Sequence, residues 1–188
     1  MKIGVLALQG AVREHLWALE ACGVETVSVK DPEDLQGLAG LVIPGGESTT
    51  VGKLLVRYGL LGPVKEQART GMGVFGTCTG MILLACDRVN NTQPRLGLME
   101  IEVVRNGFGR QIDSFEADLE IPALGEAPFP AIFIRAPYGI EADPEVEILA
   151  TFEKKIVLAR QGKFLACAFH PELTADLRLH QYFLNLLK

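Results

Sequence analysis

The stretch Gly73-Val74-Phe75-Gly76-Thr77-Cys78-Thr79-Gly80-Met81-Ile82-Leu83-Leu84 joins two apolar runs through a Gly-x-Cys-x-Gly turn. The serine form of this turn places a nucleophile on a sharp bend between a strand and a helix. Gly76 and Gly80 flank Cys78 at the positions where strand and helix approach closely, so side chains there have to be small. The first turn of the following helix offers unpaired N–H groups and the positive end of its dipole, which favour a thiolate. The pattern predicts a nucleophilic Cys78, and the alternative is a small cysteine buried in the core.

The chain around this turn predicts an α/β fold. Short apolar runs alternate with helical patterns up to Cys86, an order typical of an open sheet with right-handed crossovers. We therefore expect a three-layer, mostly parallel, flavodoxin-like sheet flanked by helices, in a single domain over residues 1–188. Ligands in such sheets bind beyond the C-terminal ends of the strands. Strands are expected at residues 2–8, 24–29, 41–43, 73–75, 99–104, 112–121, 131–134, 146–151, 156–159 and 164–168, and helices at residues 11–22, 51–58, 60–70, 81–85 and 173–188, with another helix beginning near Asp31.

Composition narrows the classes of function. Hydrophobic residues make up 48% of the chain and charged residues 22%, which is ordinary for a compact globular protein. The net charge of −5 argues against a nucleic-acid partner, and no run of about 18 apolar residues is present that would span a membrane. The N-terminal residues lack the apolar core of a signal peptide. We therefore expect a cytoplasmic protein with free cysteines, and the cysteine and histidine spacings predict no metal site.

A glycine pair follows the third predicted strand, in Pro44-Gly45-Gly46-Glu47-Ser48-Thr49-Thr50. Two adjacent glycines let the backbone approach a ligand, and their N–H groups can point at an oxyanion. Gly45 and Gly46, together with the N–H of Thr79, would form an oxyanion hole at the same edge of the sheet as Cys78. The alternative is a plain glycine-rich turn. The segment is not a phosphate-binding P-loop, because no Gly-Lys-Ser/Thr ends it.

The last predicted strand ends in His170-Pro171-Glu172. In an extended segment, side chains two residues apart leave on the same side, so Glu172 can hold the ring of His170 toward a nucleophile. Cys78 as nucleophile, His170 as base and Glu172 as orienting acid make the full set for acyl transfer. The alternative is that His170 and Glu172 are near each other by chance. The other two histidines, His15 and His180, lie in predicted helices and are expected at the surface or partly packed.

Arg105 begins a loop after the strand expected at residues 99–104. A guanidinium group holds a carboxylate well through paired hydrogen bonds, so Arg105 is a candidate for binding an acidic group of a substrate. An exposed charged loop is the alternative.

These motifs resemble the class I, or triad, glutamine amidotransferases, and more closely the family of glutaminase subunits of pyridoxal 5'-phosphate synthases. Gly-x-Cys-x-Gly with a later His-Pro-Glu is typical of the superfamily, and Leu-Gln-Gly and Phe-Gly-Arg-Gln are typical of the vitamin B6 branch. One departure is Thr79, where many members have alanine. The resemblance covers essentially the whole chain and is carried by residues 4–11 with Glu14-His15, by residues 44–50 and 76–80, by Arg105-Asn106, residues 108–111 and Ser114-Phe115-Glu116, by residues 133–137 and by residues 168–174.

The resemblance implies a function. Cys78 would attack the amide of L-glutamine, releasing ammonia, and water would release glutamate from the thioester. No cofactor is implied. Ammonia would pass to a partner, the (β/α)₈-barrel synthase subunit, within a large hetero-oligomer that makes pyridoxal 5'-phosphate. The resemblance also implies that the subunit is inactive or weakly active alone, and the loop at residues 44–48 is where we expect the partner to order the oxyanion hole. The implied glutamine-binding residues are Gly46, Glu47, Ser48, Arg105, Ile134 and Arg135.

Two other readings remain at this point. A cysteine hydrolase or deglycase-like protein of the same fold typically carries histidine directly after the elbow cysteine, where this chain has Thr79. A non-catalytic subunit that only binds a partner would hold Cys78, His170 and Glu172 together by coincidence.

Overall fold

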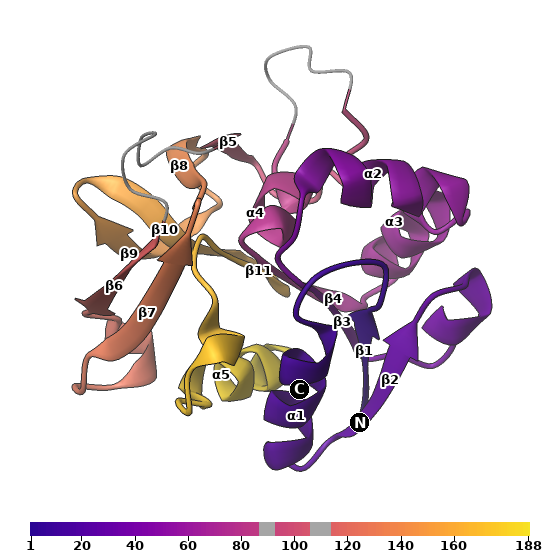
Figure 1. Ribbon diagram of the computed structural model, residues 1–188, viewed down its shortest axis with the longest axis horizontal. Coiled ribbons are helices and arrows are strands. Elements are labelled where there is room, and N and C mark those ends of the chain that lie inside the picture. Colours follow the sequence, from indigo (N-terminus) through magenta and orange to yellow (C-terminus); the bar gives the residue numbers. More distant parts are fainter. Residues whose placement is uncertain (87–92, 106–113) are drawn as a thin grey trace.

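The computed structural model describes residues 1–86, 93–105 and 114–188. Its main element is a nine-stranded sheet in the order β2-β1-β3-β4-β11-β10-β8-β5, with β9 paired to β10, and β6 pairs with β7 in a separate two-stranded sheet (Figure 1). The strands are β1 (Lys2–Leu6), β2 (Glu25–Val29), β3 (Gly40–Ile43), β4 (Gly73–Thr77), β5 (Ile101–Val104), β6 (Ser114–Leu119), β7 (Phe129–Ile134), β8 (Tyr138–Ala142), β9 (Glu147–Phe152), β10 (Lys155–Gln161) and β11 (Phe164–Cys167).

Helices cover both faces of the sheet and confirm the expected α/β class. In Figure 1, α2, α3 and α4 lie on one side of the parallel strands, and α1 and α5 lie on the other side. The α-helices are α1 (Val12–Ala21), α2 (Ser48–Arg57), α3 (Leu61–Arg69), α4 (Thr79–Leu84) and α5 (Arg178–Leu186), and short 3₁₀ turns are η1 (Pro32–Leu35), η2 (Pro122–Leu124) and η3 (Pro171–Leu173). Within the described ranges, no helix combines the length and the apolar character needed to cross a bilayer.

The sheet is parallel from β2 to β11 and antiparallel beyond it. Every residue of β3 and β4 is buried, as expected for parallel strands with helices on both faces. The antiparallel part extends from β11 through a hairpin whose turn contains Gly162, with φ of +58°. The expected parallel sheet is therefore present, and antiparallel strands widen it.

Two local expectations were wrong, and one strand was not expected. The helix expected from residue 31 is only the 3₁₀ turn η1. The last helix begins at Arg178 rather than at residue 173, because the Thr174 hydroxyl accepts from the N–H of Asp176 and the Asp176 carboxylate accepts from the N–H of Arg178. The guanidinium of Arg178 also donates to the carbonyl oxygens of Ala127 and Pro128. The strand β8 was missed, since its Gly139 and exposed Ile140 obscure the alternating pattern.

Candidate active site

Cys78 occupies the strained turn between β4 and α4. Its φ of 49° and ψ of −101° fall outside the ordinary regions for a residue with a side chain. A Cβ on Gly76 would lie 2.4 Å from the carbonyl carbon of Gly80, and a Cβ on Gly80 would lie 2.5 Å from the carbonyl oxygen of Ile43. Both glycines are therefore required by close backbone approach. The local geometry is the nucleophile elbow that the Gly-x-Cys-x-Gly spacing predicts.

Cys78 opens onto a cavity of about 530 Å³. The cavity lies at the C-terminal ends of β1, β3 and β4, where a doubly wound sheet binds its ligands. All of the residues predicted for the site except Glu172 line it. The lining residues are Gln9, Gly10, Ala11, Gly45, Gly46, Glu47, Ser48, Cys78, Thr79, Ile82, Arg105, Ile134, Arg135, His170 and Leu173.

His170 and Glu172 meet behind this cavity. The distance from His170 Nδ1 to Glu172 Oε1 is 2.8 Å, and the Glu172 side chain is fully buried. The expected contact is present, but the reason given for it was wrong: residues 171–173 form the 3₁₀ turn η3 rather than an extended segment. The backbone N–H of His170 donates to the carbonyl oxygen of Ile132, 2.8 Å away, which fixes the start of this turn.

Burial and charge act in opposite directions on this pair. Burial by itself would lower the pKa of His170, but its interactions with Cys78 and Glu172 raise the pKa to about 10. Burial by itself would raise the pKa of Glu172. The neighbouring His15 and His170 rings outweigh this effect, so the pKa of Glu172 is below its ordinary value. The site therefore favours a protonated His170 beside an ionised Glu172.

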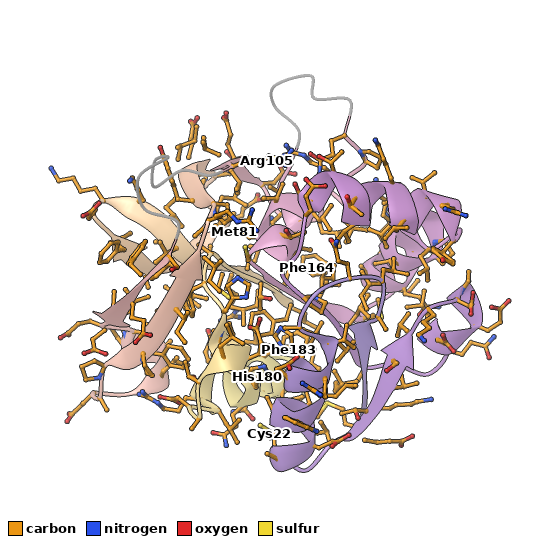
Figure 2. The ribbon with its side chains drawn as sticks, in the orientation of Figure 1. Cys22, Met81, Arg105, Phe164, His180 and Phe183 are labelled. Carbon is orange, nitrogen blue, oxygen red and sulfur yellow. The ribbon has the colours of Figure 1, made fainter. Side chains whose placement is uncertain are left out.

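His15 and His180 also belong to this region, so the prediction that they lie at the surface or are partly packed was wrong. Both are fully buried, His15 on α1 and His180 on α5, and Figure 2 shows His180 with Phe183 on the inner side of α5. His15 Nδ1 lies 3.0 Å from His180 Nε2, and His15 Nε2 lies 3.4 Å from Glu172 Oε2. The helical patterns of α1 and α5 place both residues on helices but do not reveal that these helices lie on the same face of the sheet, where their two histidine rings meet.

The glycine-rich loop lies directly against the candidate nucleophile and base. A Cβ on Gly45 would lie 2.4 Å from His170 Cε1 and 3.3 Å from Cys78 Cβ. The Thr79 hydroxyl donates to the carbonyl oxygen of Gly46 at 2.5 Å, and the N–H of Glu47 donates to Gln9 Oε1 at 2.9 Å. The peptide between Gly46 and Glu47 is thus held at both of its polar atoms, with its oxygen bound by Thr79.

Glu47 and Arg105 form a charged pair at the mouth of the cavity. Arg105 Nη2 lies 2.9 Å from Glu47 Oε1, and Arg105 Nη1 lies 3.1 Å from Thr49 Oγ1. Glu47 caps the N-terminus of α2 by accepting from the N–H groups of Thr49 and Thr50. The hydrogen bond from the Thr50 hydroxyl is the main reason that the pKa of Glu47 is lowered to about 2. Glu47 therefore carries its negative charge at any physiological pH.

The other predicted binding residues lie on the same cavity. The Cys78 thiol is directed at the carbonyl oxygen of Ile134, 3.8 Å away, and Arg135 follows with a φ of 43°. Ser48 is buried, and its hydroxyl has no hydrogen-bond partner in the part of the chain that the structure describes. Asn106 and the Phe108-Gly109-Arg110-Gln111 motif lie outside the described residues.

The remaining cysteines are not equivalent to Cys78. Burial raises the pKa of Cys167 well above its ordinary value, and its thiol donates to the carbonyl oxygen of Phe169. Burial likewise raises the pKa of Cys22. The Cys86 thiol donates to the carbonyl oxygen of Ile101. All four cysteines are free, and of these Cys78 alone lines the cavity.

Five lining residues were not singled out as site residues from the sequence. Gln9 and Gly10 had the clearest signal, since they directly follow the strand expected at residues 2–8 and so lie at the C-terminal edge of the sheet. Gly10 has a φ of +97°, and a Cβ there would collide with the carbonyl oxygen of Gly45. Ala11, Ile82 and Leu173 carry no chemical signal and supply apolar wall.

Comparisons with known proteins agree with this geometry. The model of the SNO glutamine amidotransferase family matches residues 5–188. A relative from Moorella thermoacetica named pyridoxal 5'-phosphate synthase subunit PdxT is 62% identical over 187 residues, with 100% of each chain covered. One of the same name from Pelotomaculum thermopropionicum is 64% identical over 185 residues, covering 98% of this chain and 94% of its own. A crystal structure described as a glutamine amidotransferase superposes with a TM-score of 0.92 at 50% identity, with 98% of each chain covered.

Proposed function

The chain belongs to the SNO glutamine amidotransferase family, and we propose that it hydrolyses L-glutamine to L-glutamate and ammonia with Cys78 as the nucleophile. The observation that carries this proposal is the placement of Cys78 on a strained elbow, beside a His170 that is held by the buried carboxylate of Glu172. The arrangement supports acyl transfer through a nucleophile, a base and an orienting acid.

In the first half of the reaction, His170 already holds the proton that the Cys78 thiol has given up, and the Cys78 sulfur attacks the side-chain amide carbon of glutamine. The tetrahedral intermediate collapses as the C–N bond breaks, and His170 returns the proton to the leaving nitrogen, which departs as ammonia. In the second half, His170 removes a proton from water as the water attacks the thioester carbon. The C–S bond breaks, glutamate leaves, and His170 keeps the proton taken from water, which restores the starting state of the site.

The charged pair at the mouth of the cavity suits the backbone end of glutamine. Free glutamine carries an ammonium group and a carboxylate on one carbon, and Glu47 and Arg105 present the complementary charges side by side. Gly46, Ser48, Ile134 and Arg135 complete the proposed binding surface. This placement directs the side-chain amide inward, toward Cys78.

The proposed oxyanion hole consists of the N–H groups of Gly45, Gly46 and Thr79. Removing one donor from such a hole typically costs about 10²–10³ in turnover. In this structure the carbonyl oxygen of Gly46 is tied to Thr79 on the wall of the same cavity. We infer that the loop at residues 44–48 adjusts when the synthase subunit binds, which gives a physical reason for weak activity of the chain alone.

The proposed partner is the (β/α)₈-barrel subunit of pyridoxal 5'-phosphate synthase, within a large hetero-oligomer to which this chain supplies ammonia. The name of the relatives supports this partner. We take residues 1–188 to act as one glutamine amidotransferase domain, since the apolar core of the described residues is a single cluster that reaches from β1 to α5. The four free thiols support a reducing cytoplasm as the compartment.

The test is glutamate release from L-glutamine by the purified chain, with and without the matching synthase subunit. We expect release to appear or to rise sharply when the subunit is added. A verified complex of folded chains that releases no glutamate would overturn the proposed activity.

A further inference from the structure

The three histidines of the chain gather around one carboxylate. Glu172 lies in η3 and His170 directly precedes that turn, while His15 comes from α1 and His180 lies next to His15 on α5. His15, His180 and the side chain of Glu172 are completely buried. The chemistry proposed above uses His170 and Glu172 and leaves two buried polar rings without a role.

Short distances connect these groups into a series of hydrogen-bonding contacts that ends at His170. His180 Nε2 lies 3.0 Å from His15 Nδ1. His15 Nε2 lies 3.2 Å from the hydroxyl oxygen of Thr77 and 3.4 Å from Glu172 Oε2. The opposite carboxylate oxygen, Oε1, lies 2.8 Å from His170 Nδ1. Glu172 is therefore approached by an imidazole on each of its two oxygens.

The hydrogen bonds available to each ring nitrogen determine which atom of His180 and of His15 carries the proton. His180 Nδ1 is buried and has no hydrogen-bond partner among the described residues, and a buried N–H without an acceptor is costly. His180 therefore carries its proton on Nε2 and donates to His15 Nδ1, which must then be an acceptor. The proton of a neutral His15 is left on Nε2, where it faces Thr77 and Glu172 Oε2.

Glu172 Oε2 needs this donor. It is buried and makes no hydrogen bond of ordinary geometry within the described ranges, and the Nε2–H of His15 stands 3.4 Å away. Burying a charged oxygen without a hydrogen-bond donor costs more free energy than burying an uncharged polar atom in the same way. A small rotation of the His15 ring toward Glu172 Oε2 is therefore favourable.

We propose that His15 is a positioning residue, which His180 orients so that its Nε2–H holds the second carboxylate oxygen of Glu172 and keeps Glu172 aligned on His170. This proposal rests on the proposed function, because it assigns the chain of rings to the same reaction. His15 acts through Glu172 and touches neither substrate nor sulfur.

A neutral His15 suits this role better than a charged one. Burial lowers the pKa of His15, although Glu172 and Glu14 act to raise it, and burial together with the nearby His15 lowers the pKa of His180 to about 3. A cationic His15 would compete with His170 for the charge of Glu172. A neutral ring supplies a hydrogen bond and leaves the charge to His170.

The first test measures the protonated nitrogens by ¹⁵N NMR of the isolated chain. With three histidines the assignment is simple, because His15→Gln and His180→Gln each remove one set of signals. We expect neutral His15 and His180 at pH 7, both with the proton on Nε2. A proton on Nδ1 of His15 would overturn the proposal whether or not the protein hydrolyses glutamine.

The second test measures turnover in the complex with the synthase subunit. His15→Leu should lower kcat by roughly 10-fold or more, with the KM for glutamine within about twofold, since a hydrogen bond to a charged group is lost. His15→Gln places an amide N–H near the position of Nε2 and should restore most of kcat. His15→Asn places its amide near Nδ1, away from Glu172, and should not.

A control variant distinguishes loss of the alignment of Glu172 from a general loss of stability. Phe183→Leu removes a buried ring next to His180 on α5 without touching the polar chain, so it should lower the midpoint of unfolding and leave kcat near the wild-type value. Equal kcat in His15→Leu, His15→Gln and His15→Asn would overturn the proposal. An inactive wild-type complex would instead overturn the proposed glutaminase activity.

Discussion

The hydroxyl of Thr79 donates a 2.5 Å hydrogen bond to the carbonyl oxygen of Gly46. Thr79 follows the candidate nucleophile, and Gly46 belongs to the loop that would stabilise the oxyanion. The bond ties a backbone acceptor to the wall of a cavity that is expected to offer donors during catalysis. Together with the Gln9–Glu47 bond, it holds the loop in the conformation that, in our proposal, changes when the synthase subunit binds.

Replacing Thr79 by alanine should therefore raise the activity of the isolated chain relative to its activity in the complex. A neutral hydrogen bond contributes about 0.5–1.5 kcal/mol, so the ratio should rise by roughly 2- to 10-fold. Glutamate release with and without the synthase subunit gives the ratio directly. Thr79→Ser keeps the hydroxyl and serves as the control. An unchanged ratio in Thr79→Ala would mean that the bond does not restrain the loop.

Replacing Glu172 by glutamine should move the ionisation of His170. The interactions with Cys78 and Glu172 raise the pKa of His170 to about 10 against the effect of burial, and removing the negative charge of Glu172 should lower it toward 6.5. His170 would then lose its proton at a lower pH than in the wild-type chain. The ring ¹⁵N shifts followed against pH measure this change. A value that stays where it is would show that Glu172 does not set the charge of His170.

Replacing Arg105 by alanine should raise the KM for glutamine and leave kcat close to the wild-type value. Hydrogen bonds to charged groups contribute about 1.5–3 kcal/mol, which corresponds to a rise of roughly 10- to 100-fold in KM. Steady-state kinetics of the complex measure both constants. Arg160→Ala is the matched control, because Arg160 also pairs with a glutamate, Glu147, and does not line the cavity. A wild-type KM in Arg105→Ala would show that Arg105 is an exposed loop residue without a role in binding glutamine.

The sequence predicted the features whose geometry depends on residues close together along the chain. Gly76 and Gly80 specify the elbow at Cys78 because strand and helix touch there, and Gly45-Gly46 follows a strand whose end is fixed by the sheet. These features need only the chain within a few residues and the rule that parallel strands end at a common edge. The α/β class and the edge that carries the cavity follow from the same information.

The sequence did not predict contacts between elements that are far apart along the chain. The burial of His15 and His180 depends on how α1 and α5 lie on the same face of the sheet, and residues 165 positions apart give no local sign of that contact. His170 and Glu172 meet as expected, but through a 3₁₀ turn that Pro171 begins rather than through an extended strand. The antiparallel strand β8 is short and contains a glycine, so its pairing with β5 and β10 decides its structure more than its own residues do.

Trapping the covalent intermediate would test the central claim most directly. The complex would be quenched in acid during turnover of L-glutamine, and the peptides analysed by mass spectrometry. We predict a glutamyl adduct on the peptide that contains Cys78, none on Cys22, Cys86 or Cys167, and loss of both adduct and glutamate release in Cys78→Ala. Undiminished glutamate release by Cys78→Ala would contradict the account.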